Sequence, residues 1–121
     1  MTPEAQRIAI AEAYGYVAIG NSWWQVPGRE TQVALLGLPD YCNDLNAMAE
    51  AEAQVITGLQ IETFVKHLMV ITDHEHPKDD WGLCEWCLWY VLRATAAQRA
   101  EAFLRTLGRW QETNPKEPHG D

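Results

Sequence analysis

The sequence is poor in basic residues. Lys and Arg total 9 against 17 Asp and Glu, so the formal net charge is −8 at pH 7. Proteins that bind long nucleic acids normally carry a basic surface that displaces the counterions of the phosphate backbone. We therefore expect no long nucleic acid as a partner. A small anionic ligand is still compatible with this charge, because a few local arginines dominate the field at short range.

Cysteines and long apolar runs are also scarce. The chain has 3 cysteines, an odd number that does not suit a disulfide framework. No apolar run reaches the length of a membrane span, and residues 1–6 lack the basic and apolar regions of a secretory signal. We expect a cytoplasmic protein with reduced thiols and no membrane contact.

The residue patterns of several common catalytic sites are missing as well. The sequence contains no GxSxG nucleophile elbow, no P-loop and no GxGxxG dinucleotide motif. Glu50 and Glu52 lie two positions apart on an expected helix, so their carboxylates diverge around its surface. We expect a binding protein without a cofactor rather than an enzyme. The alternative is an enzyme whose site assembles from residues far apart in the chain.

Capping signals predict a helix near each end of the chain. Thr2 and Pro3 suit the N-cap and the first helical position, and Gly15 suits the left-handed exit. Residues 95–98 form a capping box that predicts a helix over residues 95–107. Its apolar stripe consists of Ala100, Phe103, Leu104 and Leu107.

Short runs of β-branched and aromatic residues predict a small antiparallel sheet after the first helix. Turn signals separate the expected strands, which are residues 16–19, 23–26 and 31–36. A further aromatic run, residues 83–92, predicts another strand.

Helical spacing of apolar residues predicts two helices in the middle of the chain. Asn43 or Asp44 would cap a helix over residues 45–52, and a second would cover residues 60–71, for which a strand is the alternative. The elements together predict an α+β fold with a small antiparallel sheet flanked by helices, an α/β/α sandwich.

The predicted elements fit one domain over residues 1–110. Residues 111–121 contain two prolines and few apolar residues, which predicts a disordered tail.

Aromatic residues and arginines gather in the last third of the chain, and they suggest a ligand site. Aromatic faces stack on nucleobases, and guanidinium groups hold phosphates through paired hydrogen bonds. A small nucleotide would suit such a cluster; the alternative is that these aromatic side chains form sheet core or an oligomer interface. The candidate residues are Trp81, Trp86, Trp89, Tyr90, Arg93, Arg99, Arg105 and Arg109.

A zinc site is a competing hypothesis for the same region. Zn²⁺ prefers imidazole and thiolate ligands in a tetrahedron, which His74, His76, Cys84 and Cys87 would supply. Against it, an extended chain sends the two cysteines to opposite faces of the strand. We therefore expect no bound metal.

The likeness to a known family depends on residues 40–52 and 94–110, which read DYCNDLNAMAEAE and ATAAQRAEAFLRTLGRW. They resemble the phage ABA-sandwich domain, which occurs in small phage and prophage proteins. The first helix, the strand after it and the early Trp-Pro segment fit the same pattern, whereas residues 54–84 match nothing in it. The resemblance implies helices flanking an antiparallel sheet.

A small phage protein of this shape is also similar to the anti-defence sponges that counter Thoeris immunity. Those proteins sequester cyclic ADP-ribose isomers, and some bind cyclic oligonucleotides, without cleaving them, as symmetric oligomers. The resemblance implies a homo-oligomeric phage protein that blocks host antiphage defence in the infected bacterium. The alternative is a protein-binding or structural oligomeric module without a nucleotide ligand.

Overall fold

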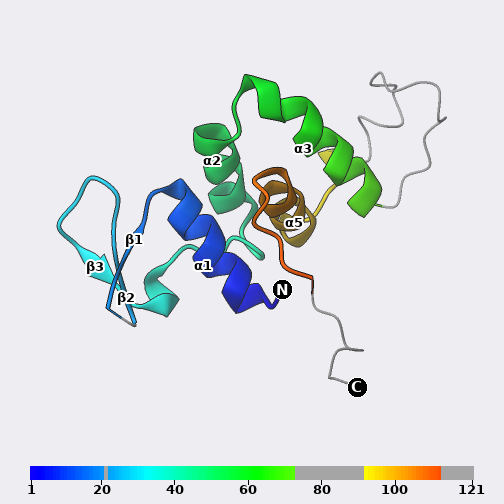
Figure 1. The fold of residues 1–121 in the computed structure, drawn as a ribbon. Helices are drawn as coiled ribbons and strands as arrows, with labels where there is room; N and C mark the ends of the chain where they lie inside the picture. Colours follow the sequence, from blue (N-terminus) through cyan, green and yellow to red (C-terminus); the bar gives the residue numbers. More distant parts are fainter. Residues whose placement is uncertain (21, 73–91, 113–121) are drawn as a thin grey trace, which may run out of the picture.

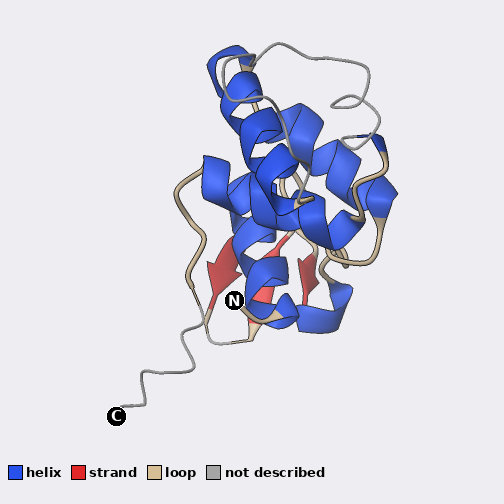
Figure 2. Ribbon diagram, turned by 90° about the vertical axis from the view of Figure 1, so that its right-hand side faces the viewer, coloured by secondary structure: helices blue, strands red, loops and turns tan. Residues whose placement is uncertain are grey.

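The computed structural model describes residues 1–20, 22–72 and 92–112, and these residues form four α-helices and a small sheet (Figures 1 and 2). The helices are α1 (Pro3–Tyr14), α2 (Leu45–Val55), α3 (Gly58–Ile71) and α5 (Ala96–Thr106). The strands are β1 (Val17–Ile19), β2 (Trp23–Gln25) and β3 (Gln32–Val33), followed by a 3₁₀ turn, η1 (Leu35–Gly37). The predicted α+β class is confirmed.

The predicted helix caps are present at both ends of the fold. The Thr2 hydroxyl accepts a hydrogen bond from the Ala5 amide at 3.0 Å, and Gly15 leaves α1 with a φ of 133°. At α5 the Gln98 amide donates to the Thr95 hydroxyl at 3.1 Å, while the Thr95 amide donates to the Gln98 side chain at 2.9 Å. These bonds satisfy amides that the first helical turn leaves without partners.

The two middle helices are longer than predicted. Asp44 caps α2 by accepting from the Asn46 and Ala47 amides, and the helix continues to Val55. The sequence predicts that Gly58 separates the two middle helices, but α3 begins at this residue. The reason is a second capping arrangement, in which the Gln60 side chain accepts the Thr57 amide at 3.1 Å. The alternative of a strand over residues 60–71 is wrong.

The sheet is antiparallel in the order β1-β2-β3, as expected from the turn signals. Trp24 of β2 is paired with Ala18 and Val33, is buried, and donates its indole N–H to Glu12 of α1 at 3.1 Å. The described helices lie together on one side of this sheet (Figure 1). The described residues place no helix on the other side, so a sandwich with helices on both sides stays a prediction.

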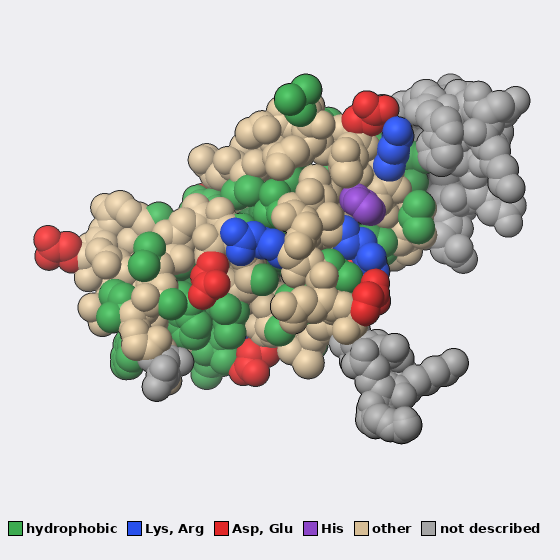
Figure 3. Space-filling model, in the orientation of Figure 1, with side chains coloured by type: hydrophobic (Ala, Val, Ile, Leu, Met, Phe, Trp, Pro, Cys, Tyr) green, Lys and Arg blue, Asp and Glu red, His purple; other side chains and the backbone are tan. Residues whose placement is uncertain are grey.

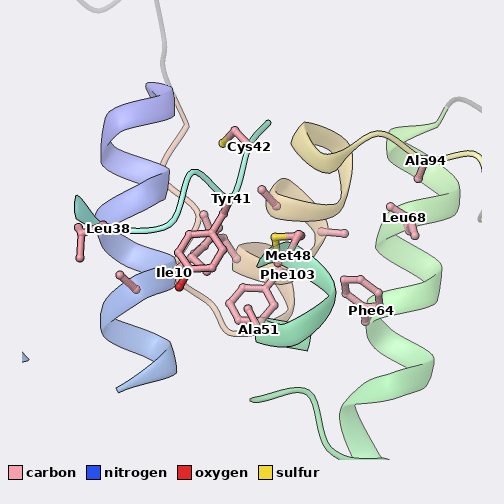
Figure 4. Close-up of a cluster of buried hydrophobic side chains, with 14 of the residues drawn as sticks. Ile10, Leu38, Tyr41, Cys42, Met48, Ala51, Phe64, Leu68, Ala94 and Phe103 are labelled. Atoms are coloured by element: carbon pink, nitrogen blue, oxygen red, sulfur yellow. The ribbon is translucent and has the colours of Figure 1, made fainter. Parts of the chain in front are cut away.

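Helix α5 is the centre of the hydrophobic core, because it packs against α1, α2 and α3. Its Phe103 and Leu104 are fully buried, as the predicted apolar stripe requires. Phe64 and Leu68 of α3 point toward the same centre (Figure 4). Met48 of α2 is also fully buried and belongs to the same cluster. The core thus joins the two ends of the sequence.

Some predictions fall on parts of the chain that the structure does not describe. The expected strand over residues 83–92 lies outside the described residues except at Leu92, which is helical, so its predicted end is wrong. Residues 113–121 of the expected tail also lie outside the described residues. Gln111 and Glu112, which were predicted to belong to that tail, contact the Met1 amino group and Arg105, respectively. Among the described helices, none combines the length and apolarity needed to cross a membrane.

Candidate functional site

Arg99, a predicted phosphate ligand, holds α5 to its neighbours. Its guanidinium group donates two hydrogen bonds to the Glu52 carboxylate of α2, at 2.8 and 2.7 Å. It also lies 5.8 Å from the ring centre of Phe64 on α3. A phosphate at Arg99 would have to displace this carboxylate.

Arg105 is also engaged with carboxylates. It donates to Glu101 at 2.7 Å and to Glu112 at 2.8 Å, and its guanidinium carbon lies 5.1 Å from the Trp110 ring centre. Although partial burial opposes it, these two carboxylates raise the pKa of Arg105. Arg105 therefore meets different partners from Arg99, and the two do not share a carboxylate.

The remaining predicted ligand residues are at the surface or outside the described parts of the chain. Arg93 and Arg109 are exposed. The predicted stacking residues Trp81, Trp86, Trp89 and Tyr90 lie outside the described residues. The same holds for the histidines and cysteines of the zinc hypothesis, so both hypotheses stay predictions.

A cleft between α1, the β2–β3 turn and α2 is the stronger candidate site, and we call it the tyrosine cleft. Its volume is ≈ 340 Å³, which lies in the range of about 300–1,000 Å³ typical of small-molecule sites. It is lined by Tyr14, Tyr16, Val26, Pro27, Arg29, Pro39, Tyr41, Ala47 and Glu50.

Local structure explains why three tyrosines meet here. Tyr14 ends α1, and the left-handed Gly15 turns the chain so that the Tyr14 and Tyr16 ring centres lie 6.1 Å apart. Tyr41 arrives from the segment after η1 and is only 2% exposed, with its ring in the core beside Ile10 and Met48 (Figure 4). The cleft is thus built on the hydrophobic core.

Hydrogen bonding and charge are concentrated at one wall of the cleft. The Tyr14 hydroxyl donates to Glu50 Oε2 at 2.9 Å, and this bond raises the pKa of Tyr14. Burial raises the pKa of Tyr16, and the Glu50 charge adds to the rise while Arg29 opposes it. Burial, followed by the neighbouring tyrosines and Glu50, raises the pKa of Tyr41. Glu50 therefore lies close enough to all three tyrosines to affect their ionisation.

The cleft has the chemistry of a binding site. The partly exposed rings of Tyr14 and Tyr16 offer flat faces for stacking, whereas the Tyr41 ring is buried in the core. Phenol hydroxyls both donate and accept hydrogen bonds. Arg29 supplies one positive charge and Glu50 one negative charge. A tyrosine is already protonated near neutral pH at its ordinary pKa, and the raised pKa values of these three keep them so over a wider pH range.

A second depression lies between α3 and α5. Its volume is ≈ 400 Å³, and its lining residues are His67, Val70, Ile71, Glu101 and Arg105. Since Arg105 already binds two carboxylates, this depression offers fewer groups to a ligand than the tyrosine cleft does.

Metal binding gains no support from the parts of the chain that the structure describes. No group of three or more His, Cys, Asp or Glu side chains is placed there to hold an ion. Cys42 is buried, its thiol donates to the Gln6 side chain at 3.3 Å, and burial raises its pKa. This thiol is therefore a structural group rather than a reactive one.

The tyrosine cleft has only a weak signal in the sequence, in which the six tryptophans are more conspicuous. Tyr14 and Tyr16 flank a glycine at a helix end, which is a signal for two rings near one turn. Neither Tyr41 nor Glu50 is close to them in sequence, so only the packing of α1 on α2 brings the set together.

Comparison of the chain with protein-family models, with curated proteins and with solved structures gives no match. The resemblance to the phage ABA-sandwich domain therefore stays a prediction.

Proposed function

We propose that this protein binds a small nucleotide in the tyrosine cleft without converting it. The observation that carries the proposal is the convergence of Tyr14, Tyr16, Tyr41, Arg29 and Glu50 on one cavity of ≈ 340 Å³. Aromatic faces stack on nucleobases, and an arginine recognises phosphate. The protonated tyrosines among its lining residues suit retention of a ligand better than covalent catalysis.

The resemblance to the anti-defence sponges suggests which nucleotides the cleft would bind. An anti-defence sponge of a phage would sequester a cyclic ADP-ribose isomer or a cyclic oligonucleotide and so block a host immune signal. A cavity of ≈ 340 Å³ has room for one nucleotide unit of such a molecule, with the rest outside. Two of its lining residues, Arg29 and Glu50, are exposed, so the part of the ligand outside the cavity could extend into solvent.

Calorimetric titration with cyclic ADP-ribose isomers and cyclic oligonucleotides tests the proposal. We expect at least one of them to release or absorb heat with saturation, and chromatography after heat denaturation should recover it unmodified. Absence of binding by every one of these ligands would contradict the proposal. Recovery of a cleaved ligand would replace the binder with an enzyme.

Two arginine variants decide which site the ligand occupies. Arg29→Gln removes the cation of the cleft, and Arg109→Gln removes an exposed cation from the site predicted from the sequence. We expect Arg29→Gln to weaken binding at least about tenfold, because a charged hydrogen bond to phosphate is lost, and Arg109→Gln to leave it unchanged. The opposite result would move the site to the C-terminal arginines.

A second function, a homo-oligomeric structural module, is favoured by one observation. Val17, Ile19 and Trp23 share the outer face of the β1–β2 pair and are 60%, 37% and 51% exposed. Figure 3 shows hydrophobic side chains gathered at the sheet end of the molecule. Light scattering on Trp23→Ser separates the two functions: loss of an assembly together with normal nucleotide binding would assign this face to oligomerisation.

A further inference from the structure

Glu50 is the one acidic side chain among the residues that line the tyrosine cleft. It lines the tyrosine cleft from α2, and its Oε2 already accepts the Tyr14 hydroxyl at 2.9 Å. Among the described residues, none donates a hydrogen bond to its Oε1. A carboxylate oxygen can accept more than one hydrogen bond, so Glu50, which lines the cleft, retains acceptor capacity.

A carboxylate at this position imposes a condition on the ligand. It can only accept hydrogen bonds, and it repels phosphate and the lone pairs of ring nitrogens. The part of the ligand that meets Glu50 must therefore carry hydrogen-bond donors, which a nucleotide has as ribose O–H groups and as N–H groups of its base. Because Glu50 is hydrogen-bonded to Tyr14, whose ring would stack on the base, the donors of the base are the nearer ones. The phosphate must lie toward Arg29, whose charge influences the Tyr16 hydroxyl at the same cleft.

The nucleobases differ in how well they meet this condition. The Watson–Crick edge of guanine has two adjacent donors, the ring N1–H and the exocyclic amino group, which match the two oxygens of one carboxylate. Adenine offers one amino donor next to a ring nitrogen that only accepts, and this lone pair would face the carboxylate. Cytosine has the same arrangement, and uracil has a single donor between two carbonyl oxygens.

From this geometry we infer that Glu50 selects guanine as the base held in the tyrosine cleft. The inference depends on the proposed nucleotide-binding function and restricts its ligand to nucleotides that contain guanine. The rings of Tyr14 and Tyr16 contribute stacking, Arg29 orients the phosphate, and Glu50 reads the donor edge of the base. Tyr14 acts as a positioning residue, because its hydroxyl fixes one oxygen of the Glu50 carboxylate.

Titration of the full chain with cyclic di-GMP and cyclic di-AMP tests the inference, since the two probes share a backbone and differ only in the base. We expect cyclic di-GMP to bind at least about tenfold more tightly, the effect of a pair of charge-assisted hydrogen bonds that one base makes and the other does not. Equal affinity, a preference for cyclic di-AMP, or binding of a cyclic ADP-ribose isomer alone, whose base is adenine, overturns the inference but leaves the proposed function intact. If neither cyclic di-GMP, nor cyclic di-AMP, nor any cyclic ADP-ribose isomer binds, both the inference and the proposed function are overturned.

The isosteric variant Glu50→Gln identifies the residue responsible. Its amide can still accept from Tyr14 but presents donors where guanine also has donors, so the preference for cyclic di-GMP should fall to near unity. The matched control is Glu62→Gln on α3, whose carboxylate is exposed and pairs with Lys66; it should keep the full preference. Retention of the preference in Glu50→Gln would show that another group reads the base.

Discussion

At the scale of single residues, Tyr41 makes the stability of the protein sensitive to alkaline pH. Burial raises its pKa above the ordinary value of 10.0, so the folded state favours the protonated phenol. The unfolded chain ionises at the ordinary pKa and the folded chain only at higher pH. Stability due to this group is therefore fully present below the ordinary pKa and is lost as pH rises above it.

We expect Tyr41→Phe to flatten this alkaline loss. Between about pH 9 and pH 11, the free energy of unfolding should fall less steeply in the variant than in the unmodified protein. Urea denaturation at several pH values measures the slope. Because the pKa values of Tyr14, Tyr16 and Cys42 are also raised, part of the slope should persist. An unchanged slope would mean that Tyr41 is not protected from ionisation.

The ion pair between Arg99 and Glu52 is the strongest candidate for a stabilising polar contact. Both side chains are largely buried, at 22% and 13% exposure, and the pairing uses two hydrogen bonds. We expect Arg99→Gln or Glu52→Gln to lower the free energy of unfolding by about 1–3 kcal/mol, since each leaves a poorly hydrated partner behind.

A double-mutant cycle with both substitutions should show that their effects are not additive. The exposed pair Lys66–Glu62 provides the control, with an expected coupling of about 0.5 kcal/mol or less. Additive effects at Arg99 and Glu52 would contradict the view that Arg99 has a structural role instead of a ligand-binding one.

At the scale of secondary-structure elements, two glycines at helix boundaries should respond oppositely to alanine. Gly15 ends α1 with a φ of 133°, and an added Cβ would lie 3.4 Å from the Pro27 side chain. We expect Gly15→Ala to cost about 1–3 kcal/mol through backbone strain. Gly58 begins α3 with open space around it, so Gly58→Ala should stabilise the fold by about 0.4–1 kcal/mol.

Thermal or urea denaturation of the two variants measures both effects in one experiment. Equal changes at the two positions would contradict the proposed role of Gly15. A destabilised Gly15→Ala would also be expected to bind ligand less well, because this turn sets the spacing of Tyr14 and Tyr16.

Helices were easier to predict from this sequence than strands or the site. Thr2, Asp44 and Thr95 act through neighbours one turn away, so their caps are readable locally. The sheet was predicted in outline, but β3 has only two residues because the chain turns into η1 at Leu35. Strand ends depend on pairing with other strands, which the local sequence does not specify.

The candidate site was the least predictable part, for a physical reason. Arg99 and Arg105 have the composition of a phosphate site, yet carboxylates from α2, α5 and the C-terminal segment bind them. Charge pairing across tertiary contacts decides whether an arginine is available, and a single sequence does not show these contacts. For the same reason, the sequence does not show that Tyr41 and Glu50 lie beside Tyr14.

At the scale of the whole molecule, one cluster of buried side chains joins the sheet to the helices. Phe103 is fully buried in a cluster that includes Trp24 from the sheet and Phe64 from α3. We expect Phe103→Ala to lower the free energy of unfolding by about 3–5 kcal/mol. Circular dichroism and tryptophan fluorescence should still report coincident transitions; separate transitions would show that the sheet end unfolds independently.

The distribution of charge over the surface also limits what the molecule contacts. On the face shown in Figure 3, basic side chains lie in small groups near acidic ones. A net charge of −8 then repels polyanions at long range, while a cleft with one arginine can still hold a small anion at contact distance.

The central position of α5 also has a consequence for the time course of synthesis. This helix packs against α1, α2 and α3, yet its residues leave the ribosome after all three. At about 5–20 residues per second, the nascent chain would spend seconds with Phe64, Leu68 and Met48 lacking their final neighbour. Closure of the core must await the last helix, and during that interval a chaperone that covers apolar helix faces has a substrate.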